Sequence, residues 1–218
     1  MFPYMIGEDK DGYKPALEYA VKCFAEKAPL KMSEKSGATF DSKQSTMRIK
    51  SLGQMLDVKY PEGEIVFSNS KHMPPWNWRW LILHYLSRAD NTPITNKLIS
   101  YRELENGSVN YPAILSKIIN PLVKKFSQEP VEQIKAACLK LGASIEEGGD
   151  VCAKIHLFPK FPLTIKLWLG DEEFKGSANI LFDISANQYL DTEAINEAGI
   201  MVSYFLIKQY ELMQTRNC

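Results

Sequence analysis

Three tryptophans and a histidine fall close together between residues 76 and 86. Trp76, Trp80 and His84 recur every four residues, so a helix would place them along one slowly drifting face. This stripe would offer a flat apolar surface beside one imidazole, which suits a flat organic ligand or axial ligation of the metal in that ligand. The alternative is a core helix whose His84 bonds a backbone carbonyl, because aromatic stripes are usually core.

Tyr101 and Arg102 form a second candidate site. They stand shortly before Asn106-Gly107, a dipeptide typical of a tight turn. The Arg102 guanidinium is a planar bidentate donor that could clamp a carboxylate or a phosphate. The alternative is an arginine paired with a neighbouring acid at a corner between a loop and a strand.

A third candidate site is acidic. It combines three adjacent acids, the aromatic residues on either side and a fourth acid: Trp168, Asp171, Glu172, Glu173, Phe174 and Asp183. Grouped carboxylates suit a hard metal ion or acid–base catalysis. An extended chain would hold Glu173 and Asp183 about 33 Å apart, at roughly 3.3 Å per residue, so they converge only if the chain turns near Gly170 and Gly176. The alternative is a solvated acidic turn.

The sequence lacks the motifs of common enzymes and metal sites. Its cysteines, at positions 23, 138, 152 and 218, form no CxxC pair and predict neither a zinc site, an iron–sulfur cluster nor a disulfide framework. Phosphate-loop, dinucleotide, nucleophile-elbow and HExxH motifs are also missing. A catalytic couple between Cys138 or Cys152 and His156 is possible only through the fold.

The composition is that of an ordinary globular protein. The 218 residues carry 26 basic and 26 acidic side chains, and this balance argues against nucleic acid or an acidic membrane as partner. The N-terminus shows no basic segment followed by an apolar one, and the apolar stretch 80–86 is too short to cross a bilayer. We therefore expect a soluble, cytoplasmic, reduced protein.

The hydrophobic pattern predicts strands and helices in blocks. Helices are expected over residues 14–27, 75–88, 111–127, 131–141 and 192–212, a small antiparallel meander over 47–67, and strands over 151–157, 163–169 and 178–183. Because helices and strands do not alternate, the class is α+β. We expect one compact domain over residues 1–218, with its core at about 14–212 and antiparallel sheets that carry helices on one side.

Several segments resemble one family along nearly the whole chain. They are Ser36–Ala38, Leu52–Gly53, Leu81–Leu86, Ile99–Leu104, Trp168–Phe174, Leu181–Asp183 and Tyr189–Leu190. In this order they resemble the family called domain of unknown function 3786. The sequence departs from the family in having no cysteine-rich cluster domain and in having Lys175 where proline is expected, so a stand-alone role is implied.

The resemblance implies an anaerobe protein that works beside iron–sulfur or corrinoid methyl-transfer proteins. The leading hypothesis is a non-catalytic binding protein for a large cofactor, with corrinoid (cobalamin) as the best candidate, although the DxHxxG corrinoid fingerprint is missing. The proposed contacts are His84, Tyr101, Arg102, Trp168, Asp171, Glu172, Glu173, Phe174 and Asp183. The alternatives are an enzyme that uses Asp171, Glu173 and Asp183, and an interaction domain that docks redox partners. If the leading hypothesis of a cofactor-binding protein holds, the 76–85 helix and the 170–174 turn share one concavity.

Overall fold

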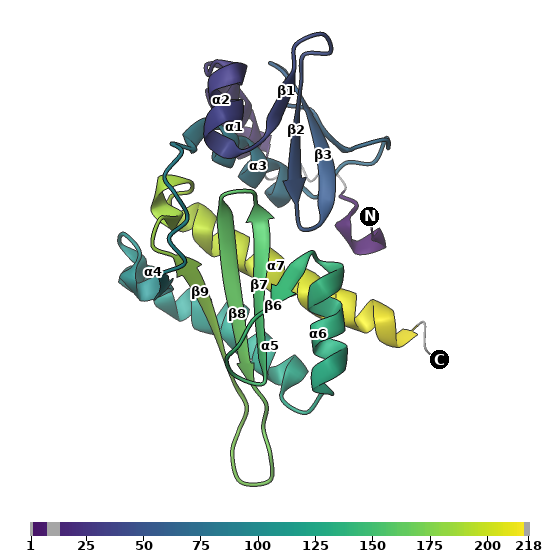
Figure 1. Ribbon diagram of the computed structural model, residues 1–218, viewed down its shortest axis with the longest axis vertical. Coiled ribbons are helices and arrows are strands. Elements are labelled where there is room, and N and C mark those ends of the chain that lie inside the picture. Colours follow the sequence, from purple (N-terminus) through teal and green to yellow (C-terminus); the bar gives the residue numbers. More distant parts are fainter. Residues whose placement is uncertain (1, 8–13, 216–218) are drawn as a thin grey trace.

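Two antiparallel sheets, each formed by its own stretch of the chain, build the protein (Figure 1). The computed structural model describes residues 2–7 and 14–215, so Cys218 lies outside it. The first part of the chain forms η1 (Pro3–Met5), α1 (Lys14–Ala25), α2 (Pro29–Ser36), β1 (Thr39–Asp41), β2 (Thr46–Ser51), β3 (Gln54–Lys59), β4 (Ile65–Phe67) and α3 (Trp76–Arg88).

The second part follows after a loop. It forms β5 (Leu98–Ser100), η3 (Tyr101–Glu103), α4 (Gly107–Ile114), η4 (Leu115–Ile119), α5 (Asn120–Phe126), α6 (Val131–Lys140), β6 (Ala143–Ile145), β7 (Val151–Phe158), β8 (Phe161–Trp168), β9 (Ser177–Asp183), η5 (Ala186–Gln188) and α7 (Thr192–Thr215). The predicted α+β class with antiparallel sheets is confirmed.

The first sheet has the strand order β1-β2-β3-β4, which confirms the predicted meander. Met47 and Ile49 on β2 lie opposite Val58 and Leu56 on β3, and all four side chains are buried. Alternate residues of a strand point to opposite faces, so one face of this sheet packs into the core. The pattern did not predict α2 or β1, which together cover one edge of the meander.

The second sheet has the order β5-β9-β8-β7-β6. Ile165 at the middle of β8 pairs with Ala153 on β7 and Ile180 on β9, and all three are buried. Helices α5 and α7 lie behind this sheet in Figure 1, and α5 contacts β9. The short edge strands β5 and β6 were not predicted, because three residues are too few to show an alternating pattern.

The two sheets meet at a pair of glycines. A Cβ on Gly142 would lie 2.9 Å from the backbone of Gly53, and both residues have a positive φ (+76° and +72°). The backbones therefore approach more closely than side chains would permit. The N–H of Leu52 also donates to the carbonyl of His156 across the same junction (3.3 Å). One continuous hydrophobic core extends through both parts of the molecule.

The helix predicted over residues 111–127 differs from the observed chain path. It begins earlier, at Gly107, and contains a π-helical segment at Leu115–Ile119. Pro121 follows this segment and has no N–H to donate, so a regular α-helical bond is lost there. Among the helices of residues 2–7 and 14–215, none has the length and apolar character needed to cross a bilayer.

Candidate functional site

Helix α3 has a core face and a half-exposed stripe. Trp78, Leu81, Ile82 and Tyr85 are fully buried. The residues that alternate with them at helical spacing are only partly buried: Trp76, Asn77, Trp80 and His84. We call these four residues the α3 stripe. The core interpretation of this helix therefore holds for one face, whereas the residues singled out from the sequence lie on the other.

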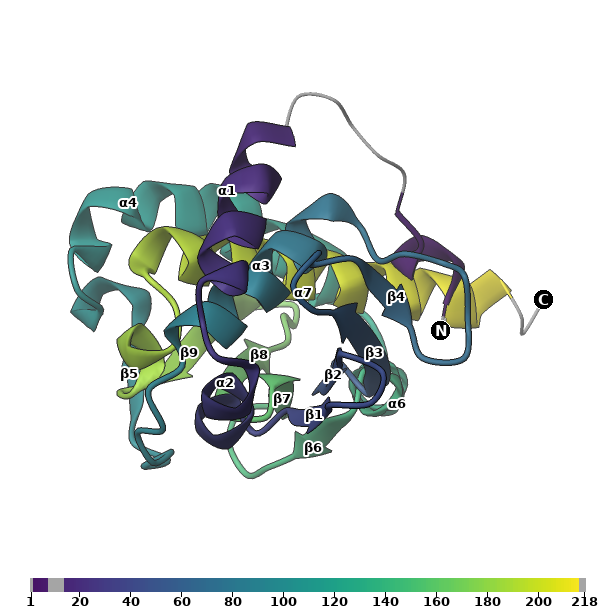
Figure 2. The ribbon, with the colours of Figure 1, turned by 90° about the horizontal axis from the view of Figure 1, so that it is seen from above.

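Helix α7 lies beside the α3 stripe (Figure 2). The Asn77 amide donates to Glu197 Oε1 on α7 (2.9 Å), and His84 bonds Asp191 just ahead of α7. Asn77 near the start of α3 meets Glu197 on α7, whereas His84 further along α3 meets Asp191 ahead of α7. The two helices therefore run in opposite directions along this seam. The stripe is thereby fixed against a second rigid element.

His84 is held by a carboxylate and not by the backbone carbonyl that was the simpler expectation. Its Nε2 lies 2.8 Å from Asp191 Oδ2, and the side chains are 22% and 44% exposed, respectively. The indole ring of Trp80 lies against the imidazole, with 5.3 Å between the ring centroids. In the described part of the chain, Nδ1 of His84 has no hydrogen-bond partner. In the neutral tautomer whose Nε2–H points at the carboxylate, Nδ1 keeps its lone pair.

Asp191 has two tasks in this arrangement. Its Oδ1 accepts the N–H of Ala194 in the first turn of α7 (2.9 Å), so it caps the helix while Oδ2 faces His84. The hydrogen bond from His84 lowers the pKa of Asp191 to about 2, because this bond and that from Ala194 outweigh desolvation. The carboxylate is therefore ionised throughout the physiological range.

Tyr101 reaches the same helix terminus from the other side. Its hydroxyl donates to the carbonyl of Thr192, the residue after Asp191 (3.0 Å), and the ring is buried. Burial raises the pKa of Tyr101, and the charges of Glu193 and Asp191 add to the effect. Two of the candidates taken from the sequence, His84 and Tyr101, thus contact the adjacent residues Asp191 and Thr192. Because Tyr101 is buried in the core, little of its side chain is accessible to a ligand.

An aromatic groove of about 450 Å³ continues from the other end of the α3 stripe. Trp76 and Asn77 form one wall, and Tyr204 and Ile200 from α7 form another. The complete lining is Tyr4, Ile6, Gly7, Pro75, Trp76, Asn77, Ile200, Met201, Tyr204 and Phe205. Tyr204 is 49% exposed, so the groove opens to solvent, and its lining mixes apolar and polar surface.

Arg102 does not join this site. Its guanidinium lies over the ring of Tyr111, 3.8 Å from the centroid, and the residue is exposed. Neither a clamp nor the expected acid pair is formed, since a cation–π contact with α4 holds the side chain instead. Tyr101 and Arg102 are neighbours in the sequence, but successive residues of the 3-10 turn point in different directions. Tyr101 therefore contacts the start of α7 while Arg102 contacts Tyr111.

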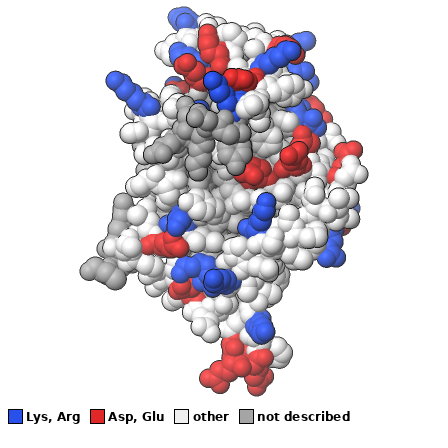
Figure 3. Space-filling view, turned by 180° about the vertical axis from the view of Figure 1, so that it is seen from behind, with Lys and Arg blue, Asp and Glu red and all other residues white. Residues whose placement is uncertain are grey.

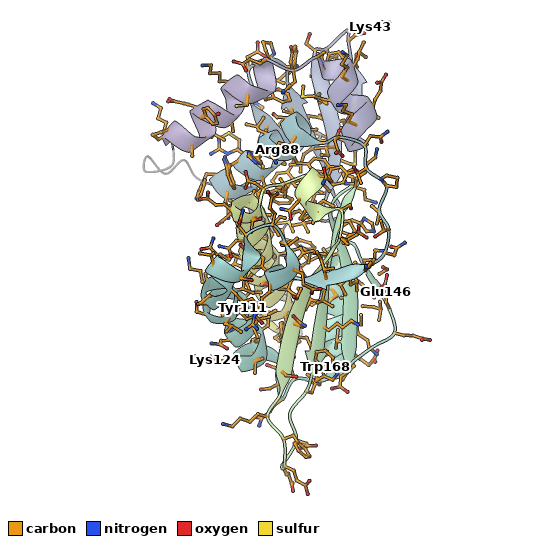
Figure 4. The ribbon with its side chains drawn as sticks, turned by 90° about the vertical axis from the view of Figure 1, so that its left-hand side faces the viewer. Lys43, Arg88, Tyr111, Lys124, Glu146 and Trp168 are labelled. Atoms are coloured by element: carbon orange, nitrogen blue, oxygen red, sulfur yellow. The ribbon has the colours of Figure 1, made fainter. Side chains whose placement is uncertain are left out.

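The acidic turn lies at the far end of the molecule from α3. Figure 4 shows Arg88, at the end of α3, near the upper helices and Trp168, at the end of β8, near the lower tip. Residues 170–176 and the segment 123–128 line a separate hollow of about 430 Å³. The turn lines one pocket, whereas Trp76 and Asn77 of the α3 stripe line another, so the expectation of one shared concavity is wrong.

Within the turn, Asp171 is structural and its neighbours are exposed. Asp171 Oδ1 accepts the N–H groups of Glu173 (2.9 Å) and Phe174 (2.7 Å), which closes the loop. The side chains of Glu172 and Glu173 are solvated and Phe174 is 70% exposed. Acidic side chains gather at this tip in Figure 3. Trp168, 42% exposed, belongs to the same hairpin.

Asp183 stands at the opposite end of β9 and takes no part in the turn. It is 2% exposed and accepts the N–H groups of Thr95, Asn96 and Ser185 together with two hydroxyl groups. Burial alone would raise its pKa, but the hydrogen bonds from Ser185, Thr95 and Asn96 prevail and lower the pKa. It lies six positions along β9 from Ser177, roughly 20 Å away. The structure therefore does not bring Asp171, Glu173 and Asp183 together.

The described residues offer no cluster of three or more His, Cys, Asp and Glu that could hold a metal ion. Cys138 is buried, and desolvation raises the pKa of its thiol to about 12. Burial also raises the pKa of Cys152. Since the thiolate is the reactive form, neither cysteine has the character of a nucleophile.

Asp191 and Tyr204 are the residues of this region that sequence reasoning missed. Asp191 immediately precedes the predicted final helix, a position where aspartate is a common cap, so its capping of α7 was predictable from the sequence. Its pairing with His84 was not, because 107 residues separate the two. Tyr204 lies inside an amphipathic helix, where nothing in the pattern distinguishes it from core residues.

The fold and the site together define a two-sheet α+β protein with an accessible aromatic stripe and a carboxylate-held histidine on one helix. The sequence profile of the family described as Domain of unknown function (DUF3786) matches residues 28–204. The chain belongs to this family, and the matched region contains α3, the β8–β9 hairpin and about the first half of α7. No curated protein and no solved structure is significantly similar to the chain.

Proposed function

We propose that the protein binds a large, flat, partly apolar cofactor along the α3 stripe and the aromatic groove, and that it is not itself a catalyst. Corrinoid is the candidate that we favour, in a cytoplasmic role beside anaerobic one-carbon or methyl-transfer proteins. The observation that carries the proposal is the His84–Asp191 pair, which leaves the imidazole Nδ1 without a hydrogen-bond partner among the described residues, next to the partly buried indole of Trp80.

The histidine pair fits a metal-centred ligand. Histidines that bind a metal usually donate their second N–H to a carboxylate, which fixes the ring and raises its basicity. His84 has this relationship with Asp191 at 2.8 Å. Trp80 lies against the imidazole and offers a surface for the edge or face of a macrocycle. His84 would therefore approach the metal, while Trp80 and Trp76 would contact the apolar ring.

The groove fits the remainder of the ligand. Ligand pockets are mostly apolar, with a few polar groups that fix orientation. Here the polar groups are Asn77, held by Glu197, and the hydroxyl of Tyr4, held by Gln209 (2.7 Å). The volume of about 450 Å³ suits a ligand that is only partly enclosed. When bound, a corrinoid supplies methyl-transfer chemistry at its cobalt, and the residues of this chain hold and orient it.

The test is a binding titration with hydroxocobalamin, cobinamide and haem, followed by visible absorption of the purified protein. We expect a band shift for a corrinoid in the wild type, and a loss of affinity of at least tenfold in His84→Ala and in Trp80→Ala. Asp191→Asn, which removes only the supporting carboxylate, should weaken binding by about 10- to 100-fold. His72→Ala is the matched control, because His72 is exposed on a loop.

Two results would contradict the proposal. One is an unchanged spectrum with all three compounds. The other is a spectrum that responds equally in the wild type and in the His84→Ala variant. Purification from the native host provides a second readout, since a bound corrinoid or tetrapyrrole would colour the protein.

A second candidate function is docking of a redox partner, such as an iron–sulfur or corrinoid protein, through the β8–β9 hairpin. The hairpin projects from the body in Figure 1, and its tip carries Phe174 at 70% exposure beside Glu172 and Glu173. An exposed aromatic residue within a charged rim is typical of an interface anchor. Capture of such a partner by the wild type but not by Phe174→Ser, with cofactor binding unchanged, would support this function.

A further inference from the structure

A basic hollow lies between the start of α2 and the end of α3, outside the surface discussed above. Its volume is about 240 Å³. Four cationic side chains line it, Lys27, Lys31, Lys35 and Arg88, and no aspartate or glutamate does. In a chain with equal numbers of acids and bases, four cations around one hollow without an acid are a local excess of positive charge.

The lysines form a row. Lys31 and Lys35 are four residues apart on α2, so they lie on the same side of the helix, about 6 Å apart along its axis. Lys27 precedes the helix by two residues and extends the row. Like charges at this spacing repel each other and destabilise an isolated helix. Helix α2 has only eight residues, so it has little propensity of its own to offset this repulsion.

None of the four cations has an ion pair among residues 2–7 and 14–215. Of the six salt bridges between described residues, five involve other lysines and arginines and one involves His84. Lys27, Lys31, Lys35 and Arg88 are all exposed. Arg88 is close enough to Asp191 to contribute to its lowered pKa, but it makes no direct contact with that carboxylate.

The start of α2 adds donors without charge. Ala28 is the N-cap and provides no capping side chain, and Pro29 occupies the first position of the helix. The leading N–H groups of a helix have no partner within it, and the helix dipole favours an anion there. Ala28 itself lines the hollow. The same space is thus lined by four cations, by Ala28 at the uncapped start of α2, and by the last turn of α3 with its C-cap Ala89.

We infer that this hollow binds a small anion of the phosphate class, such as inorganic phosphate, pyrophosphate or the phosphate group of a small ester. Arginine offers phosphate two parallel N–H bonds, and lysines bind it as point charges. A volume of about 240 Å³ is below the usual range for a drug-sized ligand, about 300–1,000 Å³, so the hollow suits a small anion better than a drug-sized ligand. This inference does not rest on the cofactor proposal.

The test compares phosphate, pyrophosphate and chloride at matched ionic strength, with calorimetric titration and thermal melts of the full chain. We expect pyrophosphate to bind more tightly than phosphate and to raise the melting temperature of the wild type. Lys31→Gln with Lys35→Gln should weaken pyrophosphate binding by at least tenfold. Lys43→Gln with Lys140→Gln, which removes the same charge at exposed sites elsewhere, should bind like the wild type.

A structural role for the lysines predicts a different pattern. If they only complement the terminal carbonyl groups of α3, the double variant should melt at a lower temperature in chloride, and neither anion should stabilise the wild type. That result overturns the inference. Binding of an oligonucleotide or of anionic vesicles without binding of phosphate or pyrophosphate also overturns it. In contrast, a double variant that melts as the wild type does in chloride, but has lost the pyrophosphate effect, supports the site.

Discussion

His84 on α3 and Asp191 ahead of α7 are 107 positions apart in the sequence and joined by a contact of 2.8 Å. The same carboxylate caps α7 through the N–H of Ala194. The pair therefore ties two helices together at their seam and presents one imidazole beside Trp80. A residue that stabilises the fold also orients the one histidine of the α3 stripe.

Asp191→Asn should destabilise the protein in a pH-dependent way. Asparagine still caps a helix, so the variant removes mainly the carboxylate charge that faces His84. Because the pKa of Asp191 is lowered from 3.8 to about 2, its contribution is complete above about pH 4 and is lost as the pH falls through about 2. We expect about 1 kcal/mol or less at pH 6, since the pair is partly solvated.

Urea unfolding of the wild type and of this variant from pH 6 to pH 2 measures the effect. The two free energies of unfolding should converge toward pH 2. A difference that stays constant over this range would show that the carboxylate charge does not stabilise the fold.

Asp183→Ala should be strongly destabilising. Its carboxylate is buried and accepts hydrogen bonds from the backbone of Thr95, Asn96 and Ser185. Removing it leaves several buried donors without an acceptor, at a cost of about 3 kcal/mol. Chemical denaturation with and without added divalent cations checks this. A nearly normal midpoint in the variant would contradict this account of Asp183.

Substitutions in the acidic turn should change the stability of the protein by different amounts at different residues. Glu172→Gln and Glu173→Gln should change the stability by about 0.5 kcal/mol or less, because both side chains are exposed. Asp171→Ala should cost about 1 kcal/mol, because two N–H groups in the turn lose their acceptor. Thermal melts at one pH separate these effects, and equal losses in all three variants would mean that the turn is not organised by Asp171.

Trp78 should couple the two sheets into one unfolding unit. The side chain is fully buried, its Nε1–H donates to Ser51 on β2 (2.8 Å), and its ring lies 5.4 Å from that of Phe205 on α7. We expect one cooperative transition in the wild type, unaffected by chelator or reductant, with fluorescence and far-ultraviolet circular dichroism in agreement. Trp78→Ala should cost about 3–5 kcal/mol.

The control is Trp80→Ala, since Trp80 is only partly buried. We expect it to lower the stability much less than Trp78→Ala while it retains a single transition. If the two probes report separate transitions in the wild type, the sheets unfold independently and the expected single domain is wrong.

Much of the fold was predictable because its signals are local. The strands 151–157, 163–169 and 178–183 were found within one or two residues of β7, β8 and β9, since alternate positions such as Ile165 and Leu167 are apolar. The helix predicted over residues 131–141 ends just before Gly142, which has a φ of +76°. The edge strands β5 and β6 and the short helix α2 were missed, because each has too few residues to show a period.

The candidate site was predicted only in part, for a related reason. The sequence by itself determined that Trp76, Trp80 and His84 share one side of a helix, because spacing along a helix fixes which side chains are neighbours. It also determined that the chain turns between β8 and β9. Only the tertiary structure decided which residues meet across elements. In it His84 contacts Asp191, Asp183 is buried among backbone N–H groups, and the acidic turn lies at the opposite end of the molecule from α3. Those contacts depend on how helices and sheets pack, and no local spacing encodes them.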